Sequence, residues 1–251
     1  MRIKVIAGNW KMNNNLSESK ELISKLLAGL KNSNLNCEVV ICPPFTSLSE
    51  ASAMIKGSKI KLGAQNLHQE ENGAFTGEVS AKMLLSAGCE FVIIGHSERR
   101  NIFMESDELI NRKIQRTIKN NLRPIFCVGE LLEEREKNIT EQVIKTQVLK
   151  GLENFSTEEL KSLIIAYEPV WAIGTGKTAT PQQAKEVHNF IRNLIGNRFS
   201  KEFAENLRIL YGGSVKPDNS KELLSQKNID GALVGGACLK ADSFLNIIMS
   251  A

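Results

Sequence analysis

The sequence has no apolar run that approaches the ~20 residues needed by a membrane-spanning helix. Its first residues enter a strand-like pattern at once and lack the layout of a secretory signal peptide. From these two absences we expect a cytoplasmic protein that does not bind membranes.

Cysteine is present but lacks the spacing of a metal site. The five cysteines lie at positions 37, 42, 89, 127 and 238, mostly inside apolar runs, and none belongs to a Cys-x-x-Cys pair. An odd number of cysteines in apolar surroundings favours reduced thiols in a cytosolic core and argues against a zinc site. No aspartate or histidine cluster has metal spacing either, so the sequence predicts no metal.

The charge pattern and the glycine pattern exclude two further classes. The net charge of +4 is mild, and lysine and arginine are scattered among acids rather than gathered in a basic stripe. This balance suits a small anionic metabolite and gives no support to a nucleic acid partner. No Gly-x-Gly-x-x-Gly follows a strand to mark a dinucleotide site, so we expect a reaction without a cofactor.

The pattern that is present is a repeat of short strand-like runs, each followed by a stretch with helical periodicity. Repeated βα units indicate a parallel sheet, and eight of them in 251 residues favour a closed (β/α)8 TIM barrel over an open doubly wound sheet. No Gly-Ser linker or low-complexity tract divides the chain, so residues 1–251 are predicted to form a single domain. The predicted strands are residues 3–7, 38–42, 59–64, 91–94, 124–128, 163–167, 208–211 and 231–234.

One predicted helix shows both its start and its buried face. Thr180 is a candidate N-cap, Pro181 suits the first helical position, and Gln183 completes a capping box. The apolar residues that follow recur at helical spacing and predict one buried face. These residues are Val187, Phe190, Ile191, Leu194 and Ile195.

The stretch 164–177 places a carboxylate where a parallel sheet presents groups to ligands. Glu168 directly follows a buried strand, and the residues after it combine an apolar flap with two glycines. We interpret this as a catalytic base beneath a mobile lid. The alternative is a strand end whose glutamate caps the next helix, with a loop that only packs. The candidate lid consists of Pro169, Val170, Trp171, Ala172, Ile173, Gly174, Thr175, Gly176 and Lys177.

Polar residues also follow the first and fourth predicted strands. Lys11 at a strand end suits an anion or a negative charge that develops on oxygen, and Asn9 suits a hydrogen bond to the same oxygen. His96 follows the fourth strand and suits an acid, a base or an electrophile. The alternatives are a surface lysine, a turn asparagine and a histidine that is satisfied in the core. His68 and His188 receive no role.

Two glycine pairs close the last two strands. Gly212 and Gly213 precede Ser214, and Gly235 and Gly236 follow the eighth strand. Glycine lets backbone N–H groups approach a phosphate closely, and barrels place phosphate at the loops after strands seven and eight. Taken alone, each pair is equally a tight turn; together they predict a phosphate site.

These parts are one carboxylate, one imidazole, one cation and a phosphate cradle, which suit proton transfer next to a carbonyl on a small phosphorylated compound. A Schiff-base aldolase is the first alternative, but it needs a lysine inside a late strand, and these strands contain none. A non-catalytic barrel that serves as a scaffold is the second. Asn9, Lys11, His96 and Glu168 together argue against it.

Six stretches of the sequence resemble the triosephosphate isomerase family, and the resemblance extends over essentially the whole chain. Residue 238 is a cysteine where the family more often has serine, a departure that concerns local packing only. The stretches are GNWKMN at 8–13, GHSERR at 95–100, CVGE at 127–130, AYEPVWAIGTGK at 166–177, YGGSV at 211–215 and GG at 235–236.

The resemblance implies interconversion of dihydroxyacetone phosphate and D-glyceraldehyde 3-phosphate through an enediol(ate), in glycolysis and gluconeogenesis. It implies that Glu168 moves the carbon-bound proton, and that His96, as a neutral imidazole, polarises the carbonyl and shuttles protons between the oxygens. Lys11 and Asn9 would stabilise the charge, with Glu98 near the histidine in a secondary role. The implied phosphate ligands are Gly174, Ser214, Gly235 and Gly236.

The resemblance also implies a homodimer. Residues 73–78 match the family's loop that projects into the partner subunit, with Phe75 and Thr76 at its tip. A phenylalanine in a glycine-flanked loop is explained if a partner covers it.

Overall fold

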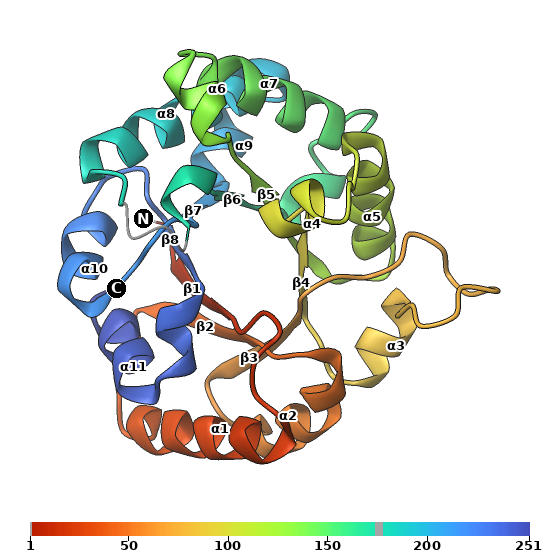
Figure 1. Cartoon of the computed structure of the whole chain (residues 1–251), viewed down its shortest axis with the longest axis vertical. Helices are drawn as coiled ribbons and strands as arrows, with labels where there is room; N and C mark the ends of the chain where they lie inside the picture. Colours follow the sequence, from red (N-terminus) through yellow and green to blue (C-terminus); the bar gives the residue numbers. More distant parts are fainter. Residues whose placement is uncertain (1, 174–177) are drawn as a thin grey trace.

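The computed structural model describes residues 2–173 and 178–251, and its centre is a closed parallel barrel (Figure 1). Each strand pairs with the next in chain order, and β8 pairs with β1. The barrel confirms the predicted fold class. Its strands are β1 (Lys4–Asn9), β2 (Cys37–Cys42), β3 (Ile60–Ala64), β4 (Phe91–Ile94), β5 (Arg123–Val128), β6 (Ile164–Tyr167), β7 (Arg208–Tyr211) and β8 (Gly231–Val234).

Helices form a ring outside the strands (Figure 1). The α-helices are α1 (Leu16–Leu30), α2 (Leu48–Ile55), α3 (Ala81–Ser86), α4 (Ser97–Asn101), α5 (Asp107–Lys119), α6 (Leu132–Glu136), α7 (Thr140–Gly151), α8 (Pro181–Arg198), α9 (Lys201–Asn206), α10 (Pro217–Leu224) and α11 (Ala241–Met249). Short 3₁₀ turns are η1 (Phe45–Ser47), η2 (Glu159–Ser162), η3 (Val170–Ala172) and η4 (Gly236–Leu239). No helix in the described ranges is long and apolar enough to cross a membrane.

The strand predictions agree with the structure to within a residue or two, and the largest difference is at β1. The sequence predicted that β1 ends at Ala7, but the strand continues because Gly8 and Asn9 pair with Ile41 and Cys42 of β2. Asn9 is therefore the last residue of the strand rather than part of the following loop. Its backbone is consequently fixed by the barrel itself.

Helix α8 begins as predicted, with the capping box of Thr180 and Gln183 and a proline in its first turn. Val187, Ile191 and Ile195 are buried on the predicted face, and Phe190 and Leu194 pack partly buried against the same core. The face also buries two polar side chains that the apolar pattern did not indicate. They are His188 and Arg192.

Alternating strand residues feed two separate hydrophobic cores. The larger lies between the strands and the helices, and the smaller fills the barrel interior with residues such as Ile93, Ile125 and Leu210. This alternation is the pattern expected for a barrel whose interior is packed rather than open. The five cysteines are free, and all but Cys37 are buried. The predicted placement of thiols in the core is thus confirmed for four of them.

Candidate active site

A cavity of about 420 Å³ opens at the C-terminal ends of the strands. Its wall includes all four side chains that the sequence predicted to act together, and it also includes both glycine pairs. The residues come from the ends of β1, β4, β6, β7 and β8, so the barrel brings distant parts of the chain to one place. They are Asn9, Lys11, His96, Glu168, Gly212, Gly213, Ser214, Gly235 and Gly236.

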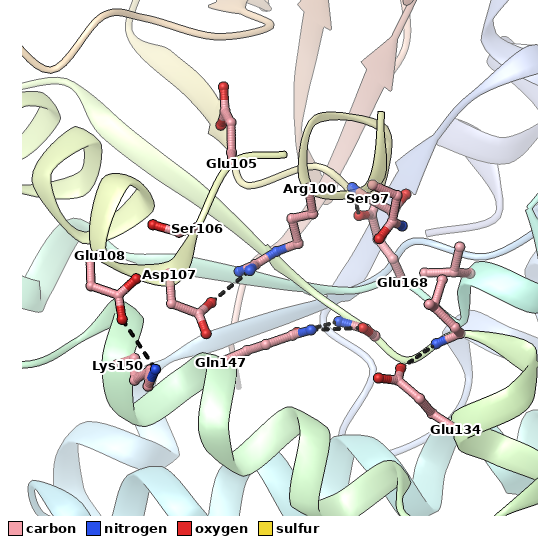
Figure 2. Close-up of a pocket in the computed structure, with 14 residues that line it drawn as sticks. Ser97, Arg100, Glu105, Ser106, Asp107, Glu108, Glu134, Gln147, Lys150 and Glu168 are labelled. Carbon is pink, nitrogen blue, oxygen red and sulfur yellow. Dashed lines mark hydrogen bonds and ion pairs between the residues drawn. The ribbon is translucent and has the colours of Figure 1, made fainter. Parts of the chain in front are cut away.

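Glu168 directly follows β6 and is almost fully buried, with 1% of its surface exposed. Its Oε1 lies 2.9 Å from Nε2 of His96, and its Oε2 accepts a hydrogen bond of 2.8 Å from the backbone N–H of Ser97. Figure 2 shows the carboxylate beside Ser97. Both carboxylate oxygens are therefore held by the first residues after β4.

The surroundings of Glu168 favour its ionised form. Burial raises the pKa of this carboxyl group, but His96, the N–H of Ser97 and the charge of Lys11 together hold the pKa below its ordinary value. A buried carboxylate that is ionised at neutral pH is suited to accept a proton. This environment is what a general base requires.

His96 is the N-cap residue of α4. Its Nδ1 accepts a hydrogen bond of 3.2 Å from the backbone N–H of Glu98, so the hydrogen-bond pattern assigns the ring proton to Nε2, facing Glu168. Burial lowers the pKa of His96, and the charge and hydrogen bond of Glu168 outweigh it, so that the pKa is raised. This increase depends on Glu168 remaining the partner of Nε2. The neutral imidazole implied by the resemblance therefore stays a prediction, and it concerns the state in which the Glu168 carboxylate no longer contacts His96.

Lys11 lies just past β1 in a left-handed conformation, with φ of 54°. The side-chain amide of Gln65 holds this turn because its Nε2 donates to the carbonyl oxygens of Lys11 at 2.8 Å and Cys42 at 2.9 Å. Oδ1 of Asn9 accepts from the N–H of Lys11 at 3.1 Å. Gln65 was not predicted as a site residue, although it directly follows β3, the same kind of position that indicated Lys11 after β1.

Glu98, for which a secondary role was expected, contacts both Lys11 and His96. Its Oε1 lies 2.6 Å from Nζ of Lys11, and its Oε2 lies 3.6 Å from Nδ1 of His96. The structure therefore joins the predicted cation, imidazole and second carboxylate in one chain of contacts. Lys11 lines the cavity and is paired there with Glu98, which is half exposed.

The two glycine pairs differ in what surrounds them. A Cβ atom added to Gly212 would lie 2.8 Å from Cγ of Glu168, and one added to Gly213 would lie 2.3 Å from the hydroxyl of Tyr211. These glycines are required because the backbone passes close to other groups. Gly236 instead borders open space, and a Cβ atom on Gly235 would meet only the end of Lys11, at 3.6 Å. The second pair leaves its backbone accessible to a ligand.

The candidate lid begins as a short apolar turn that is hydrogen-bonded to Glu130, two residues beyond β5. The N–H of Val170 donates to the carbonyl oxygen of Glu130 at 3.1 Å, and Nε1 of Trp171 donates to Oε1 of Glu130 at 2.8 Å. Ile173 lines the cavity. Pro169 and Ala172 complete the described part of the lid. The predicted lid residues Gly174, Thr175, Gly176 and Lys177, including the predicted phosphate ligand Gly174, lie outside the described residues.

Glu130 itself was quoted from the sequence but given no role. It is fully buried, and besides Trp171 it accepts a hydrogen bond of 3.1 Å from the hydroxyl of Tyr167. Burial raises the pKa of its carboxyl group, against the effect of the donors around it. Its position two residues past β5 is the signal that would have found it.

The comparisons with known proteins agree with this arrangement. The family model described as triosephosphate isomerase matches residues 4–251. Similar curated proteins named triosephosphate isomerase come from Alkaliphilus metalliredigens (52% identical over 99% of each chain) and Geotalea uraniireducens (54% identical over 99% of this chain and 98% of the relative). Another, from Chloroherpeton thalassium, is 52% identical over the full length of both chains. With a matching family model and full-length relatives at this identity, the chain belongs to the triosephosphate isomerase family.

Proposed function

We propose that this chain interconverts dihydroxyacetone phosphate and D-glyceraldehyde 3-phosphate without a cofactor. The observation that carries the proposal is the approach of His96 Nε2 to Glu168 Oε1, 2.9 Å, in a cavity that is also lined by the open glycine pair, Gly235 and Gly236. A proton donor and a proton acceptor therefore face the same small space as a candidate phosphate cradle. The metabolic setting that follows from the family is glycolysis and gluconeogenesis in the cytoplasm.

Glu168 acts as the base in this proposal. Its carboxylate removes a proton from the carbon next to the carbonyl and, once protonated, returns that proton to the neighbouring carbon. The bond electrons move into the carbon–carbon bond of the enediol(ate), so no external oxidant or reductant is needed. The lowered pKa of Glu168 keeps the group ionised before substrate binds.

His96 transfers protons to and from the two substrate oxygens in this proposal. Its Nε2 proton, now directed at Glu168, polarises the carbonyl once the carboxylate turns to the substrate, and the ring then exchanges protons between the two oxygens. When the carboxylate leaves, burial and the charge of Lys11 still lower the pKa of the ring, while the charge of Glu98 raises it. Burial is the largest of these influences, and it favours the neutral imidazole.

Lys11 and Asn9 supply charge and a hydrogen bond to the developing oxyanion. The phosphate group lies on Ser214, Gly235 and Gly236, where the backbone borders open space, with Gly174 as the expected ligand from the lid. Closure of residues 169–177 over the intermediate excludes water, which would otherwise promote loss of phosphate. The apolar Val170, Trp171 and Ile173 suit that purpose.

The chain is proposed to act as a homodimer and to fold as a single domain. The segment between β3 and α3 extends away from the barrel (Figure 1), and Phe75 near its tip is 43% exposed, while Thr76 is also exposed. The loop after β1 exposes Met12, and the segment between α4 and α5 exposes Met104. Large apolar side chains left open in this number are typical of an interface. Sedimentation of the wild type and of Phe75→Asp should give a dimer and a smaller species, respectively; a wild-type monomer contradicts the proposal.

The decisive test is an assay of the purified chain with D-glyceraldehyde 3-phosphate, in which a coupled dehydrogenase reports the dihydroxyacetone phosphate formed. The assay is run with a metal chelator and after gel filtration, so that activity depends on the protein alone. We expect full turnover under both conditions. Conversion no faster than in a blank without the protein would contradict the proposed function.

A further inference from the structure

Gln147 on α7 makes two hydrogen bonds to the backbone of one residue, Gly129. Its Oε1 accepts from the N–H of Gly129 at 2.8 Å, and its Nε2 donates to the carbonyl oxygen of Gly129 at 3.0 Å. Figure 2 shows the two parallel contacts crossing from the helix to the main chain. A pair of bonds of this kind fixes both the position and the orientation of the main chain that it holds.

Gly129 depends on this side chain because it is the first residue past β5. In the described part of the molecule, neither its N–H nor its carbonyl oxygen has a backbone partner. A side chain from α7 therefore supplies the hydrogen bonds of the first residue beyond the strand.

Gly129 in turn lies directly against the main chain of the proposed base. A Cβ atom added to Gly129 would lie 1.7 Å from the carbonyl oxygen of Glu168 and 3.2 Å from its Cα. On the strand side, the N–H of Glu168 donates to the carbonyl oxygen of Val128 at 2.8 Å. A shift of Gly129 must therefore move Glu168.

The residue after Gly129 secures the other side of the base. The carbonyl oxygen of Glu130 accepts from Val170 at 3.1 Å, and the Glu130 side chain accepts from Trp171 at 2.8 Å. Gly129 thus lies against the main chain of Glu168, and Glu130 bonds the main chain two residues later. Gln147 is the side chain that anchors this segment to the helix ring.

We propose that Gln147 is a positioning residue that fixes Glu168, and the start of the lid, by holding the backbone N–H and carbonyl oxygen of Gly129. The inference rests on the proposed function, because it concerns the geometry of the base in that reaction. Gln147 is not among the residues that line the substrate cavity; it lines a second cavity of about 320 Å³, and Glu168 lines both. It acts on the reaction only through the main chain.

The variant Gln147→Met removes both hydrogen bonds and keeps a side chain of similar length. We expect kcat to fall on the order of 10-fold, because a base displaced by a fraction of an ångström loses its alignment with the reacting carbon. The inhibition constant of inorganic phosphate should stay within twofold of the wild type, because the glycine cradle lies across the cavity. Hydrogen exchange at the Gly129 amide should become faster.

Two controls separate positioning from damage to α7. Gln142→Met makes the same substitution at an exposed site on the same helix, where the glutamine contacts only Thr146. Asn111→Leu removes hydrogen bonds to the carbonyl oxygens of Lys150, Gly151 and Glu153 at the end of α7. We expect wild-type kcat for both controls, and a lower Tm for Asn111→Leu.

A second variant covers the case in which Gln147→Met does not fold. Gln147→Glu keeps the acceptor for the Gly129 N–H and loses the donor, so its kcat should lie between those of the wild type and Gln147→Met. The proposal is overturned if the variants keep wild-type kcat while the Gly129 amide exchanges faster, or if Asn111→Leu loses kcat equally. An inactive wild type would contradict the proposed function instead. Hydrogen exchange at the Gly129 amide would still show whether Gln147 holds Gly129.

Discussion

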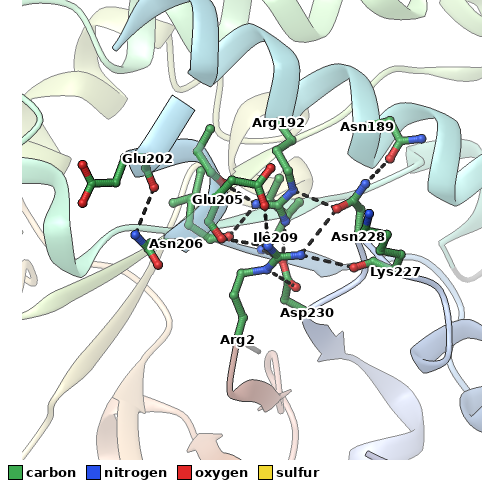
Figure 3. Close-up of polar contacts among 12 residues, drawn as sticks. Arg2, Asn189, Arg192, Glu202, Glu205, Asn206, Ile209, Lys227, Asn228 and Asp230 are labelled. Carbon is green, nitrogen blue, oxygen red and sulfur yellow. Dashed lines mark hydrogen bonds and ion pairs between the residues drawn. The ribbon is translucent and has the colours of Figure 1, made fainter. Parts of the chain in front are cut away.

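Two buried ion pairs lie at opposite ends of the barrel and differ in what surrounds them. His96 and Glu168 meet at the C-terminal ends of the strands and border a cavity of about 420 Å³. Arg192 and Asp230 meet at the N-terminal ends, 2.5 Å apart, in a network with Arg2 (Figure 3). Both pairs are almost inaccessible, yet only the first faces space that a ligand can enter.

The N-terminal pair is satisfied on every side. Besides Asp230, the Arg192 guanidinium donates to the carbonyl oxygens of Ala204 and Leu207, and Asp230 also accepts from Arg2 at 2.6 Å and from the N–H of Ile209 at 3.0 Å. The Glu168 carboxylate is held by His96 and by the N–H of Ser97, and it also borders the cavity. A closed network stabilises the fold, whereas an open pair retains the capacity to react.

Replacement of the open pair's carboxylate should give the largest effect. Glu168→Gln keeps the shape but removes the base, and we expect kcat to fall about 1,000-fold with little change in Tm. Glu168→Asp withdraws the carboxylate by about 1 Å and should lower turnover on the order of 100-fold. Steady-state assays and inorganic phosphate inhibition measure both variants. Near-normal turnover in either one would exclude Glu168 as the base.

Loss of the closed pair should have the opposite profile. Arg192→Met leaves Asp230 buried with a reduced set of partners, and we expect the free energy of unfolding to fall by about 3–5 kcal/mol, with kcat of the folded protein unchanged. Urea denaturation measures the loss. Lys161→Met, which breaks the exposed pair with Glu158, is the matched control and should leave stability unchanged. Equal losses in the two variants would contradict the comparison.

His188 lies beside the Arg192–Asp230 network and should make the stability of the fold depend on pH. It is fully buried on α8, where its Nδ1 contacts the carbonyl oxygen of Asn228 at 2.9 Å, and burial lowers the pKa of the ring to about 4, with Asp230 and Arg192 as the charged groups that also act on it. The unfolded chain takes up this proton first. The contribution to stability is therefore complete above pH ~6.5 and is lost as pH falls towards 4, by up to about 1.4 kcal/mol per pH unit.

The variant His188→Asn removes the titrating group and should flatten this part of the stability profile. Denaturant titrations between pH 4 and 7 measure the difference from the wild type. Gln142→Met, at an exposed position without a titratable side chain, is the control and should keep the wild-type slope. Parallel profiles for all three proteins would show that His188 does not titrate on unfolding.

Cys238 should give the smallest effect. The side chain is fully buried and lies beside Gly8. Cys238→Ser places a hydroxyl in this packed site, so we expect stability to fall by about 1 kcal/mol and kcat to stay unchanged. Thermal unfolding and the coupled assay measure these two quantities. A change in kcat larger than that in Tm would connect Cys238 to the reaction.

The sequence determined the strands and, through them, the four predicted reacting groups. Hydrophobic alternation and turn residues are local signals, and a side chain just past a parallel strand must face the C-terminal end of the barrel. Asn9, Lys11, His96 and Glu168 were found by this rule although up to 159 residues separate them. The sequence therefore specified which groups meet.

Only the tertiary structure decided what holds those groups in place. Gln147 lies on a helix 18 residues past Gly129, and Arg192 lies on one 38 residues before Asp230, so no local pattern connects either pair. Such partners are chosen by where the helices pack against the barrel, because that packing buries polar backbone and side-chain groups that must then find donors or acceptors. The candidate reacting groups at the strand ends can therefore be predicted from the sequence, whereas the side chains that hold them in place depend on how the helices pack against the barrel.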